Sequence, residues 1–266
     1  MSVVVPTKNS ARTIENCITS ILEQTYSNIE TIVVDSKSTD GTVEIAERFG
    51  CKVIFTDWKL LGARYQGLMA ASGDYITMID SDQVLQKDAI QRSVNLTEDY
   101  DMLCLEEKAY KPKSLIEELF EADRKLIHNE LDLQLDPIEG TLLARFYKRD
   151  ILQGAFRAIS ESLFPFVIAH DHAIIYYEAW KLSTRVGIVP HAIWHNEPTT
   201  LIELWRKNFI YGKSTKKLLD SGSYNDFLKK KTRLRKTRSR KISKDKLLSS
   251  LLLILKAPPY LVGLYL

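Results

Sequence analysis

The 266-residue sequence contains little cysteine and no clear leader segment. Its three cysteines are far apart and form neither a CxxC pair nor a Cys/His cluster. We therefore expect a reducing compartment, and neither a zinc site nor a disulfide framework. The opening residues MSVVVPTKN lack the basic segment and long apolar run of a signal peptide, so we expect none. The chain is 45% hydrophobic and 27% charged, which excludes a disordered or collagen-like protein.

Two common nucleotide-binding motifs are also absent. Neither GxGxxG nor GxxxxGK[ST] occurs in the sequence. These motifs supply the glycine-rich turns that bind dinucleotides and nucleoside triphosphates. Their absence removes the main support for a dinucleotide-binding protein or a P-loop protein.

The net charge of +3 hides an uneven distribution of charge along the chain. Residues 229–246 hold 11 Lys or Arg and one Asp, which leaves 26 basic and 33 acidic residues elsewhere. Such a block commonly meets nucleic acid or an anionic membrane surface. Because the block lacks aromatic residues and an apolar run follows at 247–266, the sequence favours the membrane surface. The expected lipid contacts are Lys229, Lys230, Lys231, Arg233, Arg235, Lys236, Arg238, Arg240 and Lys241.

The apolar run at 247–266 is about long enough to span a bilayer. Lys256 and the pair Pro258–Pro259 interrupt it. We therefore expect a helix that lies in the membrane interface, followed by a second short apolar stretch.

The first hundred residues alternate short β-branched runs with segments of helical periodicity. Strands are expected at 2–5, 31–34, 52–55 and 75–79, with helices between them. Units of this kind form parallel sheets. We predict an α/β fold with a mostly parallel, Rossmann-like sheet flanked by helices, and a basic and apolar helical tail. A helix at 115–127 and a final strand at 186–195 are also expected.

Polar clusters follow three of the predicted strands. They are PTKN at 6–9, Asp35–Ser36, and Asp80-Ser-Asp82. In an open parallel sheet, ligands bind beyond the carboxyl ends of the strands. Two carboxylates at such an edge suit Mg²⁺ or Mn²⁺ that shares its remaining sites with substrate phosphates. An isolated DxD is more often a solvated turn, but its place beside two other polar strand ends favours a metal site.

These motifs occur in the order found in family 2 glycosyltransferases, which the chain resembles densely over 2–95 and loosely to about 214. The resemblance implies the GT-A fold and an inverting, metal-dependent enzyme that transfers a hexose from a UDP- or GDP-linked sugar. Ser36 stands where the family commonly has an acidic residue. Whether the nucleotide of the donor is UDP or GDP therefore stays open. The segments that carry the resemblance are VVPTKN at 4–9, TIVVDSKSTDGT at 31–42, GAR at 62–64, ASGDYI at 71–76 and DSD at 80–82.

The resemblance also implies positions for the donor. The nucleotide is expected among Pro6, Thr7, Asn9, Asp35, Arg64, Asp80 and Ser81. Asp80 and Asp82 are expected to hold Mn²⁺ or Mg²⁺, with His195 as a further candidate ligand. Candidate contacts to the diphosphate are Arg206, Lys207 and Lys213. For several of these residues a simpler role stays open, such as capping a helix.

An inverting transfer needs a carboxylate that removes the proton of the acceptor. By the resemblance this base is Asp171, although His170 stands where the family commonly has Glu. Asp171 could instead cap a helix, and an acceptor phosphate that is already ionised would need no strong base. His170 and His172 should point to different sides of a helix, so we do not expect them to share a metal ion.

The sequence therefore predicts a catalytic domain at 1–214, with a nucleotide-binding half at 1–100 and an acceptor half at 101–214. A membrane-associating tail is expected at 215–266. The expected acceptor is lipid-linked, such as polyprenyl or dolichyl phosphate, at the cytoplasmic face of the cell membrane, where the protein would be peripheral or monotopic. No nucleic-acid partner is expected. Two alternatives stay open: a nucleotidyltransferase on a similar sheet, and a nucleic-acid-binding protein that uses the basic block.

Overall fold

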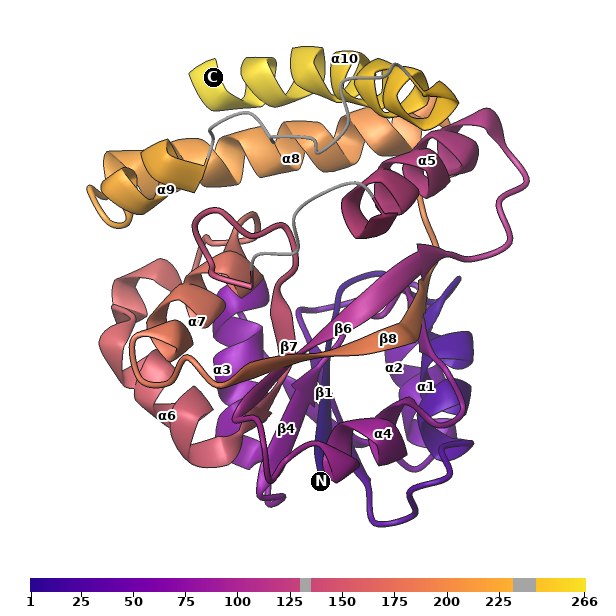
Figure 1. Cartoon of the computed structure of the whole chain (residues 1–266), viewed down its shortest axis with the longest axis vertical. Helices are drawn as coiled ribbons and strands as arrows, with labels where there is room; N and C mark the ends of the chain where they lie inside the picture. Colours follow the sequence, from indigo (N-terminus) through magenta and orange to yellow (C-terminus); the bar gives the residue numbers. More distant parts are fainter. Residues whose placement is uncertain (130–134, 232–242) are drawn as a thin grey trace.

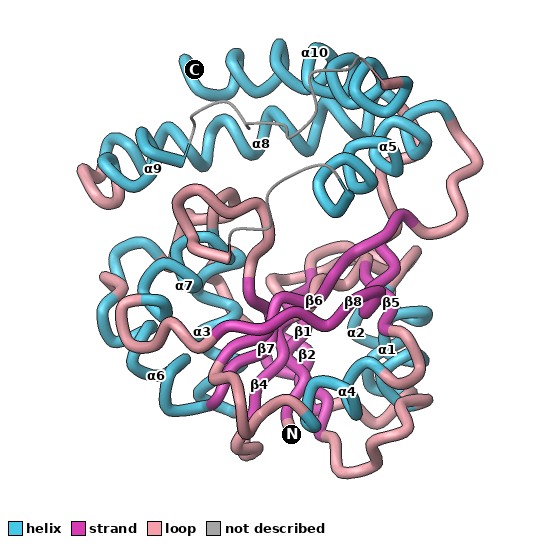
Figure 2. The backbone as a smooth tube through the Cα atoms, in the orientation of Figure 1, coloured by secondary structure: helices cyan, strands magenta, loops and turns pink. Residues whose placement is uncertain are grey.

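A computed structural model describes residues 1–129, 135–231 and 243–266. An eight-stranded sheet lies at its centre, with helices on both faces (Figures 1 and 2). The predicted alternation of strands and helices is confirmed in the first half of the chain. Its elements are β1 (Ser2–Thr7), α1 (Ile14–Leu22), β2 (Glu30–Asp35), α2 (Thr42–Arg48), β3 (Lys52–Phe55), α3 (Leu60–Ala70) and β4 (Tyr75–Met78).

The second half adds further strands to the same sheet. The order across the sheet is β3-β2-β1-β4-β7-β6-β8-β5. Neighbours run parallel from β3 to β4 and between β6 and β8, and antiparallel where β7 and β5 join. The elements are β5 (Gln83–Leu85), α4 (Ala89–Asn95), β6 (Met102–Ala109), α5 (Leu115–Asn129), β7 (Ala144–Lys148), α6 (Arg149–Ala158), the 3₁₀ turn η1 (Glu161–Leu163), α7 (Asp171–Trp180), β8 (Val186–His195), α8 (Leu201–Asp220), α9 (Asn225–Lys231) and α10 (Lys244–Tyr265).

Strand register gathers the polar strand ends at one edge of the sheet. β1 and β2 run parallel with Thr7 opposite Asp35, and β4 runs parallel to β1, so the chain leaves β4 at the same edge. β5 and β8 run antiparallel with Gln83 opposite His195. Because Gln83 follows Asp82 directly, this pairing brings the end of the last strand to the aspartates.

Alternate residues of β1 face two cores on opposite sides of the sheet. Val4 packs with buried residues of α3, α6 and α7, whereas Val3 and Val5 pack with those of α1 and α4. Helices cover both faces, which explains why the central strands read as continuous apolar runs.

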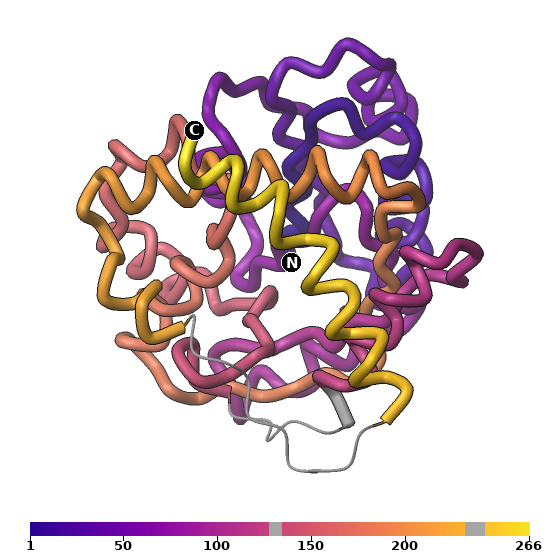
Figure 3. Tube along the Cα trace, turned by 90° about the horizontal axis from the view of Figure 1, so that it is seen from above, coloured from indigo at the N-terminus to yellow at the C-terminus, as the bar shows by residue number. Residues whose placement is uncertain are grey.

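Beyond the edge of the sheet that carries the polar strand ends, α5, α8 and α10 form a helical layer (Figure 1). Seen from above, α10 runs diagonally across α8 (Figure 3). A Cβ on Gly212 would overlap the carbonyl of Tyr260, and a Cβ on Gly263 would overlap the carbonyl of Phe209. The two glycines therefore allow the helix backbones to touch. A small core joins the three helices through Ile116, Leu119, Leu204 and Leu252.

α10 corrects the expectation of a helix broken at Lys256 and Pro258–Pro259. It is continuous over Lys244–Tyr265, with both prolines inside, although proline normally disrupts a helix interior. The Lys256 ammonium lies 4.1 Å from the centroid of the Phe120 ring, so this charge faces α5 and does not end the helix. The turn beyond the prolines is held where Gly263 packs on α8. The prediction of a separate second apolar stretch is therefore wrong.

The predicted boundary between 214 and 215 lies inside α8, which is helical over Leu201–Asp220. α10 packs extensively on α8 and on α5. The predicted tail thus begins within a helix that also belongs to the predicted catalytic domain. Its division from the rest as a membrane-associating unit stays a prediction.

Candidate active site

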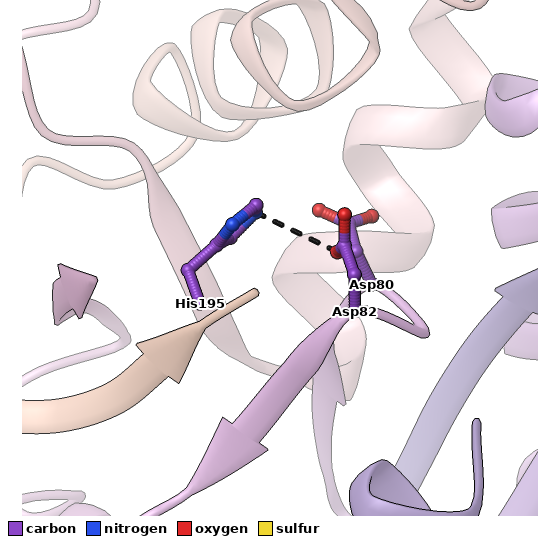
Figure 4. Close-up of side chains that lie close together, drawn as sticks. All are labelled: Asp80, Asp82 and His195. Atoms are coloured by element: carbon purple, nitrogen blue, oxygen red, sulfur yellow. Dashed lines mark ion pairs between the residues drawn. The ribbon is translucent and has the colours of Figure 1, made fainter. Parts of the chain in front are cut away.

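Asp80, Asp82 and His195 form a compact cluster of possible metal ligands. Their ligand atoms all lie within 4.8 Å of one another, and the side chains point toward one another in Figure 4. His195 Nε2 lies 3.5 Å from Asp82 Oδ1. The backbone N–H of Asn196 donates to the carbonyl of Asp82 at 2.8 Å, which continues the pairing of β5 with β8 past the end of the strand. The sheet itself thus fixes the cluster.

The donor set of this cluster fits a divalent cation. Asp82 Oδ1 is buried and has no hydrogen-bond partner in the described parts of the chain. Burying an unpaired carboxylate oxygen is costly, and a cation would satisfy it. Burial alone disfavours the charged imidazole, but Asp82 and Glu197 raise the pKa of His195. The carboxylates thus make the site attractive to positive charge.

Asp80 has a different environment from Asp82. Its Oδ1 accepts a hydrogen bond from Arg64 Nη2, and its Oδ2 accepts from Arg145 Nη1 at 3.3 Å. Burial would raise the pKa of Asp80, but Arg64 and Arg145 hold it well below its usual value. Asp80 is therefore ionised and already paired, whereas Asp82 keeps a free oxygen toward the cluster.

Arg64 joins the two halves of the site. It is fully buried on α3 and donates through Nε to Asp171 Oδ2 at 2.6 Å, as well as to Asp80. Asp171 is the first residue of α7 and is 8% exposed. The candidate base thus shares one guanidinium with the first aspartate of the DxD motif. The geometry brings Asp171 into the site, and its role as a base is untested.

A second set of buried charges forms hydrogen bonds with the residues of the cluster or with their partners. Glu107 on β6 accepts from Arg145 Nε at 2.8 Å and from Arg124 Nη1 at 2.6 Å. Arg124 on α5 also donates through Nε to Glu197 Oε1 at 2.8 Å. Burial would raise the pKa of Glu107, but Arg145 and Arg124 lower it to about 2. The site is therefore a continuous network of alternating charges, which ends where Glu197 Oε1 lies 3.2 Å from His195 Nδ1.

α8 covers the cluster with one of its predicted cations. Lys207 Nζ lies 3.7 Å from Asp82 Oδ2. Tyr211 and Asp82 raise the pKa of Lys207, although burial opposes its charge. Arg206 and Lys213 lie on the exposed side of α8, and Lys213 Nζ lies over the Phe209 ring. The structure therefore brings Lys207 alone of the three into the site.

The predicted nucleotide contacts lie at the carboxyl ends of β1 and β2. Thr7 Oγ1 donates to Asp35 Oδ2 at 2.9 Å, and the N–H of Ser38 donates to Asp35 Oδ1 at 2.8 Å. Asn9 adopts a left-handed backbone with φ of 51°, and its side chain accepts from the N–H of Thr39 at 2.9 Å. These bonds shape the rim beside the cluster. Pro6 lies at the end of β1, and Ser81 Oγ donates to Ser10 Oγ at 2.8 Å.

His170 and His172 have different partners, as predicted, but the reason differs: His170 precedes α7 with a left-handed backbone and is not part of the helix. His170 Nε2 lies 3.1 Å from Thr215 Oγ1, whereas His172 Nε2 lies 2.6 Å from Arg145 Nη1. Burial, Arg145 and Arg64 together lower the pKa of His172 well below its usual value. Its neutral ring can therefore accept from Arg145.

A cavity of about 510 Å³ lies elsewhere, between α7 and α9. Tyr177, Tyr224 and Phe227 contribute to its lining. It lies toward the end of α7 that is opposite Asp171. We place the candidate active site at the clustered ligands and not at this cavity.

Replacing Arg64 by Met is expected to lower the free energy of unfolding by about 3–5 kcal/mol, because it leaves the buried carboxylate of Asp171 and the partly buried one of Asp80 without their shared partner. Denaturant unfolding measures this change. Arg48→Met is the matched control, since Arg48 pairs with Glu15 where both side chains are more than half exposed. The control should cost less than about 1 kcal/mol. Equal losses in the two variants would contradict a central structural role for Arg64.

The sequence model of glycosyl transferase family 2 matches residues 2–166 of the chain. Glycosyltransferase GlyG of Streptococcus pneumoniae serotype 4 is 38% identical over 98 residues, which cover 34% of this chain and 33% of GlyG. The matched segment thus spans about a third of that relative's length.

The fold is similar to that of two solved glycosyltransferase structures. S. aureus TarS 1-349 in complex with UDP-GlcNAc has a TM-score of 0.58 and 18% identity, over 88% of this chain and 76% of that one. Glucosyl-3-phosphoglycerate synthase from Mycobacterium tuberculosis, in complex with Mn²⁺, UDP and phosphoglyceric acid, has a TM-score of 0.55 and 21% identity, over 84% and 78%. This likeness confirms the predicted GT-A fold. Because the family model covers more than half of the chain, the chain belongs to glycosyl transferase family 2.

Proposed function

We propose that this protein is an inverting glycosyltransferase that transfers a hexose from a nucleoside-diphosphate sugar. The observation that carries the proposal is the cluster of Asp80, Asp82 and His195, with its unpaired buried oxygen, at the sheet edge where the rim residues of β1 and β2 also lie. UDP is the favoured nucleotide, because the structures of similar fold hold UDP-GlcNAc or UDP. Family membership favours sugar transfer over the alternative of nucleotidyl transfer.

A divalent cation would be held by Asp82 and His195, with Asp80 beside them. When bound, the cation would neutralise the charge that develops on the leaving diphosphate. Mn²⁺ is favoured over Mg²⁺, because one ligand is an imidazole nitrogen and Mg²⁺ prefers oxygen ligands. The synthase of similar fold was solved with UDP and either Mn²⁺ or Mg²⁺, so the choice of Mn²⁺ rests on the imidazole ligand. Lys207, 3.7 Å from Asp82, would add a fixed positive charge beside the same phosphates.

Asp171 is proposed as the base that accepts the proton of the acceptor. Its carboxylate is held by Arg64, which leaves Oδ1 as the oxygen that can receive a proton. The same guanidinium binds Asp80, so the base is fixed relative to the metal cluster. If the acceptor is an ionised phosphate, Asp171 would orient it instead.

The acceptor is proposed to be lipid-linked, such as a polyprenyl phosphate, at the cytoplasmic face of the membrane. Among the described residues, α10 is a helix long and apolar enough to cross a membrane by length and composition. Its inner face packs on α8 and α5, and its outer face is apolar and exposed. We therefore favour a helix that lies in the interface, as in a monotopic protein. The exposed apolar residues of α10 are Leu247, Leu251, Leu253, Ile254, Leu261, Val262 and Tyr265, and Leu266 directly after the helix is exposed as well.

The basic block is proposed to assist this contact through anionic lipids. Lys229 and Lys230 are exposed at the end of α9. Lys231 points inward, where its Nζ donates to the carbonyl of Pro137 at 2.7 Å. The other predicted lipid contacts lie outside the described residues: Arg233, Arg235, Lys236, Arg238, Arg240 and Lys241.

Membrane binding is tested on the outer face of α10. Replacing both Leu253 and Ile254 by Asp puts charges at positions that are 57% and 66% exposed, so the fold should survive. We expect binding to vesicles of anionic lipid to weaken at least about 10-fold in a flotation assay, because carboxylates are costly in the bilayer. Replacing both Ser160 and Ser162 by Asp is the control, because it adds the same two charges at exposed positions outside α10. Failure of the wild-type protein to float with these vesicles would contradict the membrane proposal.

The transfer itself is tested by product analysis. The wild-type protein is incubated with Mn²⁺, polyprenyl phosphate in vesicles, and either UDP-linked or GDP-linked hexoses. We expect mass spectrometry to detect a hexosyl lipid with a UDP-linked donor. Consumption of donor without a lipid product would contradict the acceptor but not the donor site. No consumption of any donor would contradict the proposed function.

A further inference from the structure

We propose that Glu197 is a positioning residue that holds the imidazole of His195 in the orientation needed for metal binding. This inference rests on the proposed metal site. Glu197 lies two residues after His195, is 3% exposed, and places Oε1 3.2 Å from His195 Nδ1. The other nitrogen of the same ring, Nε2, lies 3.5 Å from Asp82 Oδ1. The ring thus lies between one carboxylate that can orient it and another that would share a cation with it.

The chemistry of histidine ligands explains why a carboxylate beside Nδ1 matters for metal binding at Nε2. A histidine binds a metal through one neutral nitrogen, and the proton then resides on the other. A carboxylate that accepts this second N–H fixes both the tautomer and the orientation of the ring. Glu197 Oε1 lies 3.2 Å from Nδ1 as an ion-pair contact, and Nδ1 has no formed hydrogen bond among the described residues. A proton on Nδ1 would have this carboxylate as its nearest acceptor, which would leave the lone pair of Nε2 toward Asp82.

Glu197 is itself held in place from a different part of the fold. Arg124, on α5, donates to Oε1 of Glu197 at 2.8 Å through Nε and again through Nη2. The third nitrogen of the same guanidinium donates to Glu107 at 2.6 Å, on β6. Two elements therefore prevent the Glu197 carboxylate from turning away from His195, although it lies in the connection between β8 and α8.

The competing explanation is that Glu197 only ties this connection to α5 as part of a buried ion pair. The two explanations differ in what they predict for metal affinity. If Glu197 orients His195, the affinity of the site for Mn²⁺ depends on Glu197. If Glu197 only forms an ion pair with α5, the stability of the protein depends on Glu197 and the affinity for Mn²⁺ does not. Stability alone therefore cannot decide, and a direct readout of metal binding is needed.

The test measures Mn²⁺ binding to the full chain by electron paramagnetic resonance, with Mn²⁺ alone as the probe. We expect Glu197→Gln to weaken binding roughly 10–100-fold, the range for loss of an outer-shell carboxylate. Glu203→Gln is the matched control, because Glu203 accepts from the N–H of Thr199 at 2.8 Å in the same connection and is not among the site residues.

If Glu197→Gln does not fold, Glu197→Asp keeps the charge for Arg124 but withdraws the carboxylate from Nδ1, and it should also weaken Mn²⁺ binding. Unchanged Mn²⁺ affinity in a folded variant, when the wild type binds Mn²⁺ and Asp82→Asn does not, would overturn this inference alone. Absence of Mn²⁺ binding by the wild type would overturn the proposed metal site and the inference with it.

Discussion

Replacing Asp82 by Asn is expected to lower kcat/KM for sugar transfer by about 10³-fold, which corresponds to about 4 kcal/mol of lost transition-state stabilisation. The reason is Asp82 Oδ1, which among the described residues accepts no hydrogen bond and has only the ion-pair contact with His195 at 3.5 Å. This oxygen is buried, and its charge is available to a cation. An amide keeps the shape of the side chain but lacks the charge.

The same substitution should lower the stability of the protein by no more than about 1 kcal/mol, because the ion pairs that it removes are partly exposed. Asp82 lies 3.5 Å from His195 Nε2 and 3.7 Å from Lys207 Nζ, and its side chain is 29% exposed. Asp88→Asn is the control, since Asp88 lies outside the site and pairs with Arg92 on α4. Steady-state kinetics and thermal unfolding would be measured on both variants. A loss of activity below about 10-fold in Asp82→Asn would remove Asp82 from the account of the metal site.

Replacing Asp171 by Asn is expected to lower kcat by about 10²–10⁴-fold, the usual contribution of a general base, while the affinity for UDP with Mn²⁺ stays the same. The amide oxygen of Asn can still accept from Arg64, which now donates to Asp171 at 2.6 Å. The fold and the donor site should therefore survive. Only the capacity to receive a proton is lost.

The control for this variant is Asp150→Asn, because Asp150 also lies in the first turn of a helix, α6, but is exposed. Kinetics under donor saturation separate the chemical step from donor binding. A small loss of rate in Asp171→Asn, with a large loss in Asp82→Asn, would show that no base is needed. Such a result would point to an acceptor phosphate that is already ionised.

The site residues that sequence reasoning found are those at the ends of parallel strands. Asp80 and Asp82 follow a strand whose β-branched pattern is plain, and parallel neighbours place their ends together. His195 was found as the end of the last strand, and the pairing of Gln83 with His195 explains its position. Local pattern and one topological rule predict the place of Asp80 and Asp82, whereas the role of His195 as a candidate ligand came from the family resemblance.

The supporting charges could not be found in this way. Glu107 stands between two other charged residues on β6, and Arg145 shares β7 with Lys148. Nothing in the local sequence marks which of these charges enters the site. Their place depends on β7 joining β4 in antiparallel fashion, a strand order that periodicity does not reveal. Arg124 is one charge on an amphipathic helix, where an exposed position is the ordinary expectation.

The cations of α8 show a related limit. Arg206 and Lys207 are adjacent in sequence, but successive residues of a helix point in directions about 100° apart. Only Lys207 faces Asp82. Which of the two faces the site depends on how α8 packs on the sheet and on α10, through contacts far apart in the sequence.

The central claim is a metal-dependent site for a nucleotide at Asp82, and calorimetric titration of UDP tests it most directly. UDP would be titrated into the wild type with and without Mn²⁺, then into Asp82→Asn, with GDP as the comparison. We predict that UDP binds the wild type only with Mn²⁺, that GDP binds more weakly, and that Asp82→Asn binds neither. Binding of UDP that is equally strong without Mn²⁺, or in Asp82→Asn, would contradict the metal site; no binding of either nucleotide would contradict the donor site itself.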